Sequence, residues 1–539
     1  MGRYTHVGPA MQNYQNPPYP SALPRATLPR NAALVLVPSA HLALGLIMLL
    51  ALALRLWGLA FGLPYVIQPD EPSVEMRALH MWYAGDPNSH YYVYPSLYYD
   101  LQALLAFAVA HAAGVLQPDV LRHPLVHLPL FYLAGRAFTA LLGTVTVLVV
   151  YLAGRMLSPR VGLIAALFLA VAAQHVQQSH YITVDAPTAL FTALAALFAL
   201  RALRRSGNVR DIVLGGVAAG LAAGTKYNAA VALALPIVAA LLSAQPWTRR
   251  LGACLAASMA CAAVFVLTTP FAVLDPPPFL RSLHVVAQHY AQGHPGAEGN
   301  DNALWYLQYL AQEGLLVPLT ILVVAGLAVG VVRYRRAGLV LLAFALPYYA
   351  LLCSTFVRFD RNLLPLLPIL VLFAATVADA VILPLAVALR NRSAAYVLVL
   401  GMAAGPSAYV AMRSDYAITH RFSEEVAVAW ATVHLPRGAR LATENWEGSS
   451  FEISPRHFRI THLSTLARQS YGWLLARGIG YAVADSYTDD AYLSDSRHYP
   501  LEAVRYRELF HRARLLARIT GQPLLRPGPT MSIYELRQR

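Results

Sequence analysis

Two adjacent carboxylates, Asp70 and Glu71, are the first acidic residues of the 539-residue chain, and Pro69 and Pro72 flank them. Such a pair can provide a general base and a second carboxylate that orients it, or it can hold a divalent metal, with Glu71 as the possible ligand. A solvated acidic turn or a helix cap is the commoner use of an Asp-Glu pair in a loop. Position alone leaves both interpretations open.

A third acid, Asp185, lies in a short loop, residues 179–187, at the entry to an apolar segment. Acidic side chains at membrane depth are costly unless they pair or take part in function. Asp185 is an equally good candidate for capping the next helix, because Asp is a favoured N-cap and Pro187 follows two residues later. The two roles are compatible.

Lys226 is the one lysine among 41 cationic side chains, and it directly follows a Gly-Thr pair between two apolar arms. A compact ammonium on a flexible stem suits a phosphate or a carboxylate in a tight, partly dry pocket. The alternative is a lysine that extends to the membrane interface.

Four arginines are further candidate site residues. Arg55 and Arg136 fall inside apolar segments, where a guanidinium should pair with an acid or an anion. Arg358 and Arg361 flank Asp360, and anchoring at the membrane interface is an alternative role for both.

Aromatic side chains crowd the segment that follows the acidic pair. They are Trp82, Tyr83, Tyr91, Tyr92, Tyr94, Tyr98 and Tyr99. Such rings are typical of membrane interfaces, and they can also stack on a sugar, so Tyr94, Tyr98 and His90 are candidates for lining a substrate site. Histidines at 284, 289 and 294 do not form one helical metal site, because a five-residue spacing places them on different faces.

The composition identifies a membrane protein. Hydrophobic residues make up 57% of the chain and charged residues 13%, which leaves too little polar surface for a soluble globule. The net charge of +14 comes from short arginine runs between apolar stretches, which indicate topology and exclude a nucleic-acid partner. Cys254, Cys261 and Cys353 all lie in apolar segments, so any metal must be held by oxygen or imidazole.

The chain is expected to consist of a disordered cytoplasmic tail (1–40), a transmembrane catalytic domain (41–412) and an α/β domain outside the cytoplasm (413–539). Arginine-rich loops mark the cytoplasmic side, and the outer loop 61–130 contains the acidic pair and an interfacial helix at 97–113. Residues 212–243 predict a re-entrant hairpin with its tip at 224–228. The expected spans are 41–60, 131–153, 161–178, 187–203, the two arms of 212–243, 251–273, 313–332, 337–354, 363–387 and 393–412, eleven membrane helices in all. In the last domain we expect strands at 439–443, 479–484 and 531–536 and helices at 463–477 and 502–519.

This topology restricts the chemistry. Every candidate catalytic group lies on the outer side, where nucleotide-activated sugars and ATP are normally absent, so an enzyme there would use a lipid-linked donor. Phosphate is a good leaving group, so transfer from a lipid phosphate needs one base and cations for the departing charge.

Several of these residues together resemble one group of membrane enzymes. The Asp70-Glu71 pair, the stretches 94–98 and 185–187, Arg136 and the run 220–226 are similar in order and placement to the protein O-mannosyltransferase and aminoarabinose transferase group of the GT-C glycosyltransferases. The resemblance covers most of 41–412.

The resemblance implies inverting transfer from a polyprenyl-phosphate sugar to a hydroxyl of a glycan, lipid or protein, in the plasma (inner) membrane. Asp70 would be the base and Asp185 a second acidic site residue. Arg136 and Lys226 would contact the donor phosphate. Where the aminoarabinose branch has Lys-Pro-Pro-Leu, this chain has residues 94–97, Tyr-Pro-Ser-Leu, so neither a lipid A acceptor nor a divalent metal follows from the resemblance.

Two other classes of function remain open on the residues alone. A secondary transporter would use Asp185 and Lys226 as coupling groups, although it favours an internal repeat, which the sequence lacks. A non-catalytic component of a glycan assembly or export system would make no use of Asp70.

Overall fold

The computed structural model describes residues 37–115, 124–299, 301–444 and 456–537, together with Phe451 and Ser454. The chain divides into two compact units, residues 1–43 and 44–539. The expected tail at 1–40 therefore falls almost wholly outside the described residues. Helix α1 (Val37–Leu56) provides all that is described of the first unit.

Seven helices in the described residues are long and apolar enough to cross a membrane. They are α5 (Pro124–Arg155), α8 (Asp185–Arg204), α11 (Trp247–Thr268), α15 (Leu316–Arg333), α16 (Arg335–Cys353), α17 (Leu367–Ala388) and α18 (Arg392–Ile418). Shorter apolar helices occur at Ala40–Leu56, Pro159–Ala170 and Tyr227–Leu241. The protein is therefore embedded in a membrane, and the count of eleven spans stays a prediction, since some expected spans are broken into shorter helices.

The region 212–243 reverses direction within the bundle. It contains α9 (Val209–Ala223), a 3-10 turn η2 (Tyr227–Leu233) and α10 (Ala234–Leu241). Gly215 of α9 lies against Pro236 of α10, so the second arm runs back along the first. Lys226 sits at the turn between the two arms, at the tip that the sequence predicts.

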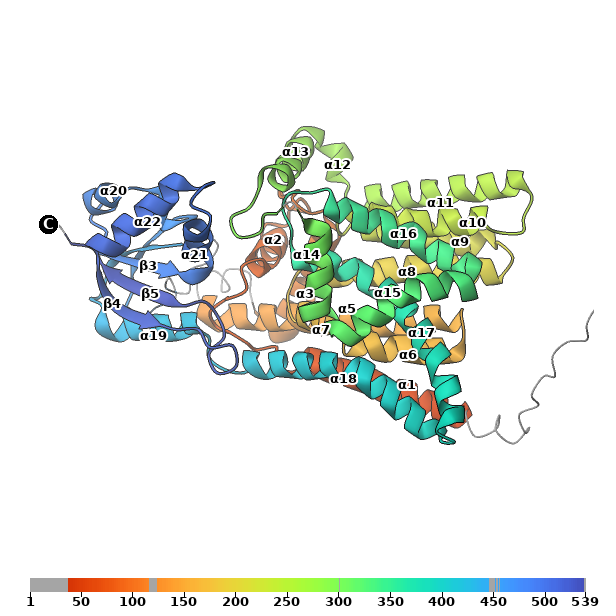
Figure 1. Ribbon diagram of the computed structural model, residues 1–539. Helices are drawn as coiled ribbons and strands as arrows, with labels where there is room; N and C mark the ends of the chain where they lie inside the picture. The colour runs from red at the N-terminus through yellow and green to blue at the C-terminus, as the bar shows by residue number, and fades with distance from the viewer. Residues whose placement is uncertain are drawn as a thin grey trace, which may run out of the picture. The chain divides into compact units, whose positions relative to one another are not determined.

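The arginine-rich loops meet at one end of the bundle. Arg160, after α5, and Arg333, at the end of α15, both pair with Asp379 of α17, at 3.5 and 3.0 Å. Arg204 at the end of α8 donates to the carbonyl of Arg155 at 3.4 Å. The helices can be followed to these loops in Figure 1.

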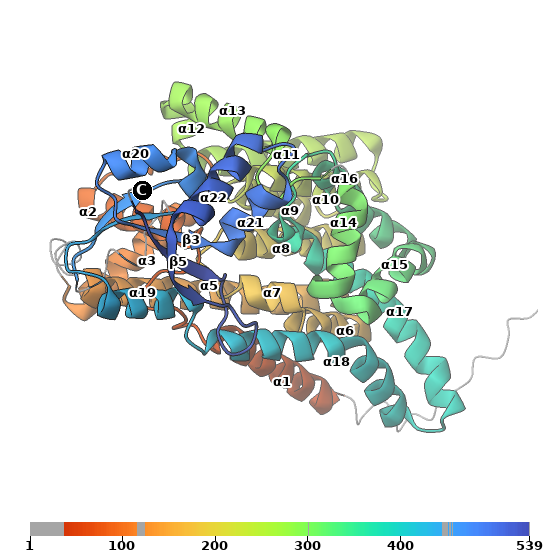
Figure 2. The ribbon, with the colours of Figure 1, turned by 60° about the vertical axis from the view of Figure 1, so that its left-hand side comes forward.

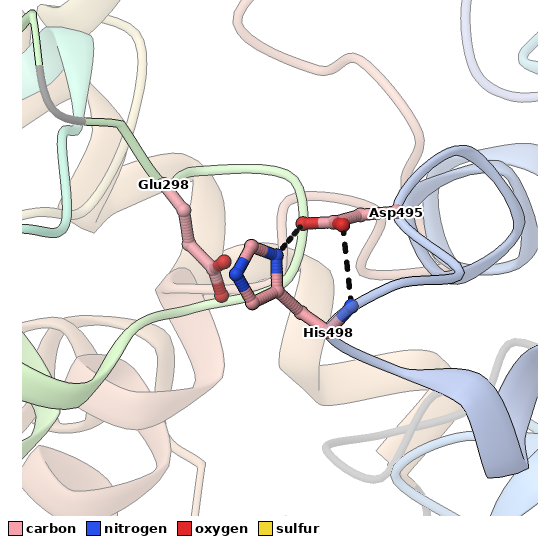
Figure 3. Close-up of side chains that lie close together, drawn as sticks. All are labelled: Glu298, Asp495 and His498. Atoms are coloured by element: carbon pink, nitrogen blue, oxygen red, sulfur yellow. Dashed lines mark hydrogen bonds and ion pairs between the residues drawn. The ribbon is translucent and has the colours of Figure 1, made fainter.

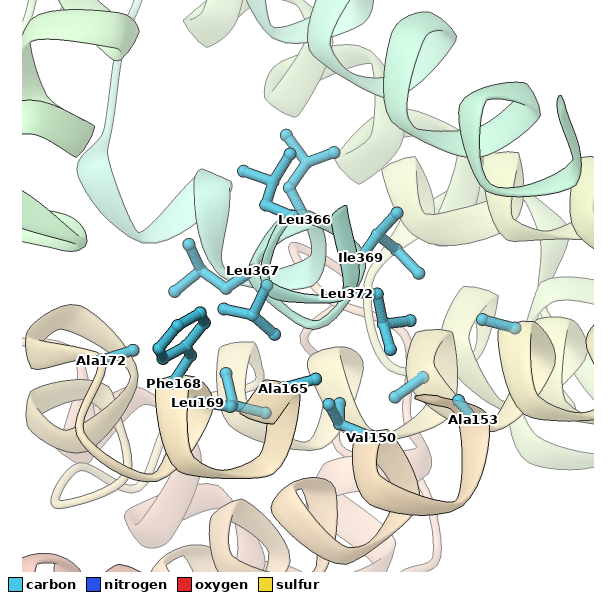
Figure 4. Packing of buried hydrophobic residues seen from close by; sticks show 14 of the residues in the cluster. Val150, Ala153, Ala165, Phe168, Leu169, Ala172, Leu366, Leu367, Ile369 and Leu372 are labelled. Carbon is cyan, nitrogen blue, oxygen red and sulfur yellow. The ribbon is translucent and has the colours of Figure 1, made fainter. Parts of the chain in front are cut away.

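The core of the bundle is built around α17 and the turn before it, η4 (Asp360–Leu366). Figure 4 shows Leu367 and Leu372 of this segment facing Phe168 and Ala165 of α6 (Pro159–Ala170) and Val150 of α5, while Leu366 and Ile369 point to the other side. Small side chains on α5 and α6 let the backbones approach closely, as is common in membrane helix packing. This packing also holds η4 in place, and η4 carries Arg361.

The remaining helical elements of this region are short. They are α2 (Glu71–Ala84), α3 (Leu97–Ala113), α7 (Ala173–Gln178), α12 (Phe271–Leu274), α13 (Pro276–Gln292), α14 (Asn302–Tyr309) and the π-turn η3 (Leu310–Gly314). The helix expected at 97–113 is α3.

The C-terminal part is an α/β domain with a five-stranded sheet in the order β2-β1-β3-β5-β4. Its strands are β1 (Arg440–Thr443), β2 (Arg459–His462), β3 (Tyr481–Asp485), β4 (Arg514–Ile519) and β5 (Met531–Glu535). Strands β1, β2 and β3 are parallel, and β5 is antiparallel to β3 and β4. The helices are α19 (Ser423–His434), α20 (Tyr471–Ala476), α21 (Ser486–Ser494), α22 (Pro500–Arg512) and the turn η5 (Leu466–Arg468).

Alternate side chains of each strand enter two separate cores. Leu441, Val483 and Ile533 pack toward α19, whereas Ala442 and Tyr534 pack toward α20 and α22. This period of two is the signature of a sheet covered on both faces, and Figure 2 shows α19 on one side of the sheet and α20 and α22 on the other.

The sequence prediction for this domain was right for three strands and right only in part for both helices, since residues 463–477 contain the turn η5 and the short helix α20. β1, β3 and β5 lie where strands were expected, but the helix expected at 502–519 ends at Arg512, and residues 514–519 form β4. The apolar residues of this stretch fit either period, and pairing with β5 decides the outcome. β2 was not predicted, since it has four residues and no clear alternation of burial.

Candidate functional site

Asp70 lies at the N-cap position of α2, but its side chain makes no capping hydrogen bond. Gln68 does the capping instead, because its side-chain oxygen accepts from the backbone N–H of Asp70 at 2.7 Å and of Glu71 at 2.8 Å. The Asp70 carboxylate is 29% exposed and accepts from Arg361 at 2.7 Å. Among the alternatives that the sequence left open, simple helix capping is therefore excluded for Asp70.

Glu71 and Arg136 form a fully buried ion pair that joins α2 to α5. Arg136 donates to both carboxylate oxygens, at 2.8 and 2.6 Å, and to the carbonyls of Leu59 and Phe61 at 2.8 Å each. Glu71 also accepts from the backbone N–H of Ile182 at 3.1 Å. This corrects two expectations, since neither the Glu71 oxygens nor the Arg136 guanidinium is free for a metal or a donor phosphate.

Lys226 and Asp185 form a second buried pair, in which Nζ donates to Oδ1 at 2.6 Å. Lys226 also donates to the side-chain oxygen of Asn362 at 2.7 Å. The three groups come from the hairpin tip, the first turn of α8 and η4. Asp185 is the first residue of α8, and the N-cap position is Val184, so pairing with Lys226 is the observed role of Asp185.

The Arg361–Asp70 and Lys226–Asp185 pairs meet at one narrow pocket, which is lined by Asp70, Tyr94, Thr183, Asp185 and Arg361 among others. The Thr183 hydroxyl is buried and has no hydrogen-bond partner among the described residues. An unsatisfied buried hydroxyl is costly unless a ligand or water completes it. The structure thus brings together Asp70, Asp185, Lys226, Arg361 and Tyr94, five of the predicted site residues.

Three predicted residues lie elsewhere. The Tyr98 hydroxyl is buried and bonded to Thr139 and Gln102. His90 is exposed and pairs with Asp86 at 2.8 Å. The Arg358 guanidinium lies over the Trp305 ring, 5.1 Å from its centre. These corrections share one reason, that each side chain has a local partner that sequence spacing does not reveal.

Arg55 meets the expectation only in part, because Asp415 interacts with its charge but its hydrogen bonds go to backbone carbonyls and a histidine. Its guanidinium is buried and donates to the carbonyls of Leu169 and Ala170 at the end of α6, and it contacts His175 Nδ1 at 2.9 Å. Carbonyls at the end of a helix carry partial negative charge and lack helical partners. Arg55 therefore satisfies a helix end.

Asn362 and Gln68 were not predicted as site residues. Asn362 follows Arg361 directly, so neighbouring residues of η4 contact the two different ion pairs. Its position beside a predicted cation is the signal that could have identified it. Gln68 gave no sequence signal, because its role depends on the turn geometry before α2.

A cavity of about 860 Å³ adjoins this site. Gln68 and Pro69, next to Asp70, line it from the membrane domain, and Glu424, Glu444 and Asp485 line it from the C-terminal domain. Burial raises the pKa of Glu444 to about 8 and raises the pKa of Asp485, while hydrogen bonds to both carboxylates oppose the shift.

A group of three possible metal ligands lies at a different place. Oxygens of Glu298 and Asp495 and a ring nitrogen of His498 fall within 4.8 Å of one another. Figure 3 shows the three side chains close together. Asp495 accepts from His498 at 2.7 Å, and Tyr499 donates to Glu298. None of the three lines the Asp70 pocket, so this group does not provide the metal site that was considered for Glu71.

The fold is that of known membrane enzymes. ArnT from Cupriavidus metallidurans in the apo state is 17% identical, with 92% of this chain and 98% of that chain covered and a TM-score of 0.54. The same protein bound to undecaprenyl phosphate is 15% identical, with 95% of this chain and 99% of that chain covered and a TM-score of 0.51. A third similar structure is the oligosaccharyltransferase AglB from Archaeoglobus fulgidus in complex with an inhibitory peptide and a dolichol-phosphate. It is 15% identical, with 86% of this chain and 72% of that chain covered and a TM-score of 0.55.

The chain thus has the fold of the GT-C membrane glycosyltransferases. Within it, residues 132–273 match the family model described as dolichyl-phosphate-mannose-protein mannosyltransferase. That segment contains Arg136, Asp185 and Lys226. No curated protein sequence matches the chain.

Proposed function

We propose that this protein is an integral-membrane, inverting glycosyltransferase that moves a hexose or pentose from a polyprenyl-phosphate carrier to an acceptor hydroxyl. One observation carries the proposal. Asp70 is a partly exposed carboxylate, unused for capping, in a pocket that also contains Arg361 and the Asp185 partner of Lys226. A base beside cations is what displacement of a lipid phosphate requires.

In the proposed reaction, an Asp70 oxygen accepts the proton of the acceptor hydroxyl as that oxygen attacks the anomeric carbon. The new bond joins acceptor oxygen and sugar, and the bond between the anomeric carbon and the phosphate oxygen breaks with its electron pair on the phosphate. Lys226 and Arg361 lie close enough to the pocket to stabilise this departing charge. Attack opposite the leaving group inverts the anomeric configuration.

The relatives support the kind of donor. ArnT is seen with undecaprenyl phosphate and AglB with a dolichol-phosphate, and both are polyprenyl phosphates. We extend this donor class to the present chain because two cations lie beside Asp70: Arg361 pairs with it directly, and Lys226 pairs with Asp185 in the same narrow pocket.

Other predicted residues receive revised roles. We propose that Glu71 and Arg136 position the start of α2, and therefore Asp70, by a buried clamp from α5. Asn362 positions Lys226, and Tyr94 lines the donor pocket. Arg358 is assigned no contact with the donor.

We also propose the orientation. The arginine-rich loops that meet around Asp379 would face the cytoplasm of the plasma membrane. The N-terminus would then be cytoplasmic, and the Asp70 pocket and the C-terminal domain would lie outside, where flipped lipid-linked sugars are available.

The test is transfer of radiolabelled sugar from a panel of polyprenyl-phosphate sugars, in membranes that contain wild type, Asp70→Asn or Asp86→Asn. Asp86 is the matched control, since it is an acid on an exposed loop near His90. We expect Asp70→Asn to fold and bind donor but to lose transfer by at least about a hundredfold. Equal activity of Asp70→Asn and wild type would overturn the base assignment, and a wild type that consumes no donor would overturn the function.

A further inference from the structure

The sheet of the C-terminal domain has a topological switch point between β1 and β3. In the order β2-β1-β3, the chain leaves β1 to one side to form β2 and then crosses to the other side to form β3. All three strands are parallel. In open α/β sheets, ligands bind in the crevice at the carboxyl ends of the strands where the connections diverge in this way.

That crevice opens into the cavity beside the Asp70 pocket. Thr443 ends β1, Glu444 follows it directly, and Asp485 ends β3; all three line the 860 Å³ cavity. Gln68 and Pro69 line the same cavity, and Gln68 is hydrogen-bonded to the backbone of Asp70. The cavity at the binding position of the sheet therefore extends to Pro69, the residue next to the proposed base, and its volume is in the range of small-molecule sites.

The side chains that line this cavity offer many carboxyl oxygens and few cations, which disfavours an anionic ligand. Besides Glu444 and Asp485, it is lined by Glu313 and Glu424, against a single arginine, Arg413, and one histidine. Among the described residues Glu424 forms no ion pair, and Ser423 donates to one of its oxygens at 3.1 Å. Carboxyl groups hydrogen-bond hydroxyls whether or not they are ionised, and one arginine and one histidine offer a phosphate little positive charge.

Aromatic side chains make up much of the remaining wall. They are Phe61, Tyr181, Phe422, Phe451, Tyr487 and Tyr492. Phe61 contacts Tyr181 and Phe422, with ring centres 5.7 and 6.0 Å apart. Rings that cover the apolar C–H face of a sugar, combined with carboxyl groups for its hydroxyls, suit a carbohydrate.

A peptide acceptor fits less well. Extended peptides commonly bind by adding a strand to an open sheet edge, but β1 and β3 are each paired on both sides. The cavity therefore offers side chains and not an unpaired edge of these strands.

We infer that the cavity at the β1–β3 switch point binds the acceptor, and that the acceptor is an uncharged, hydroxyl-rich glycan recognised by Glu424 and Asp485. The inference rests on the proposed glycosyltransferase function. It assigns acceptor recognition to the C-terminal domain and leaves the donor to the membrane domain.

The test measures transfer to three kinds of probe: uncharged hexasaccharides, the same sugars carrying a 6-phosphate, and a Ser/Thr-rich peptide. The variants are Glu424→Gln and Asp485→Asn, and the control is Asp490→Asn, an exposed neighbour on α21 that does not line the cavity. Asn retains the capping of α21 that Asp485 provides. Melting temperature and binding of undecaprenyl phosphate are measured for each.

We expect transfer to a neutral glycan, at least tenfold weaker transfer to its phosphorylated form, and none to the peptide. Each cavity variant should raise the acceptor KM about tenfold, as expected for loss of one charged hydrogen bond, with kcat and donor binding within about twofold. Donor consumption with preferred transfer to the peptide or to the phosphorylated glycan would overturn this inference and leave the proposed function intact. An unchanged acceptor KM in both variants would have the same meaning. A wild type that neither binds nor consumes any donor would overturn both this inference and the proposed function.

Discussion

At the scale of single residues, the adjacent acids Asp70 and Glu71 have opposite environments. Asp70 is partly exposed in the pocket, whereas both oxygens of Glu71 are buried and bonded to Arg136. Removing one member of a buried pair leaves the other charge uncompensated. Neutralising Asp70 should therefore reduce activity, whereas neutralising Glu71 should reduce the stability of the protein.

Glu71→Gln is expected to destabilise the protein by about 3–5 kcal/mol, because Arg136 would remain buried with its charge unpaired. Melting temperature and yield of folded protein in detergent provide the measurement, with Asp70→Asn as the companion variant. A Glu71→Gln protein as stable as wild type but inactive would show that Glu71 acts in chemistry and not in positioning.

Asn362→Ala should lower transfer, because Lys226 would keep Asp185 but lose its second acceptor. Loss of one charged hydrogen bond predicts about a tenfold or larger decrease in kcat. Asn362→Asp retains an oxygen at the same position and should restore most of the rate, which a general packing role would not explain. A decrease that Asp fails to relieve would argue against positioning of Lys226.

At the scale of elements, close helix packing holds the hairpin that carries Lys226. A side-chain carbon added at Gly216 of α9 would lie 2.3 Å from the Ala257 carbonyl oxygen of α11, and one added at Gly220 would lie 2.6 Å from that of Cys261. Glycines spaced by four let two helices approach this closely. The position of Lys226 depends on this contact through α9.

Gly216→Ala should therefore lower the melting temperature and reduce transfer, since backbone and not a flexible side chain blocks the added carbon. Gly252→Ala on α11 is the matched control, because nothing lies within 4 Å of its added carbon and Ala favours helix by about 1 kcal/mol. Thermal unfolding of both variants checks the contrast. Equal stability of the two would mean that α9 and α11 are not packed as described.

The stability of the C-terminal domain should depend on pH through Glu444, which directly follows β1. Burial raises the pKa of Glu444 to about 8, above the ordinary value of 4.5. Between these values the folded protein binds a proton that the unfolded chain releases, so the free energy of unfolding should fall as pH rises from about 5 to 8. Unfolding midpoints at pH 5, 6.5 and 8.5 should decrease in wild type and stay flatter in Glu444→Gln. A wild type whose stability rises over this range would contradict the assignment.

At the scale of the whole molecule, charge separates the two ends of the membrane bundle. Arginines from three loops meet at one end around Asp379 and the Arg155 carbonyl, while the paired pocket residues Asp70, Asp185 and Arg361 are carried by the turn before α2, the start of α8 and η4. This arrangement predicts one orientation in the membrane.

The orientation can be tested with single cysteines in a background without the three natural ones. A cysteine at Arg335 should be shielded from a membrane-impermeant thiol reagent in intact cells, whereas one at exposed Asp490 should be labelled. The opposite pattern would invert the topology and remove the access to flipped lipid-linked donors on which the proposed function depends.

The sequence by itself determined the membrane class, the α/β nature of the last domain and most of the residues that could do chemistry. Composition, arginine runs and short apolar strands are local properties, so they can be interpreted without a fold. Tertiary structure decided which of these residues act together. Asp70 and Arg361 are 291 positions apart, and Lys226 and Asn362 are 136 apart, so no local pattern could pair them. It also decided that β4 is a strand, that Glu71 is enclosed, and that the sheet meets the pocket at a cavity, because burial and long-range pairing exist only after the helices have packed.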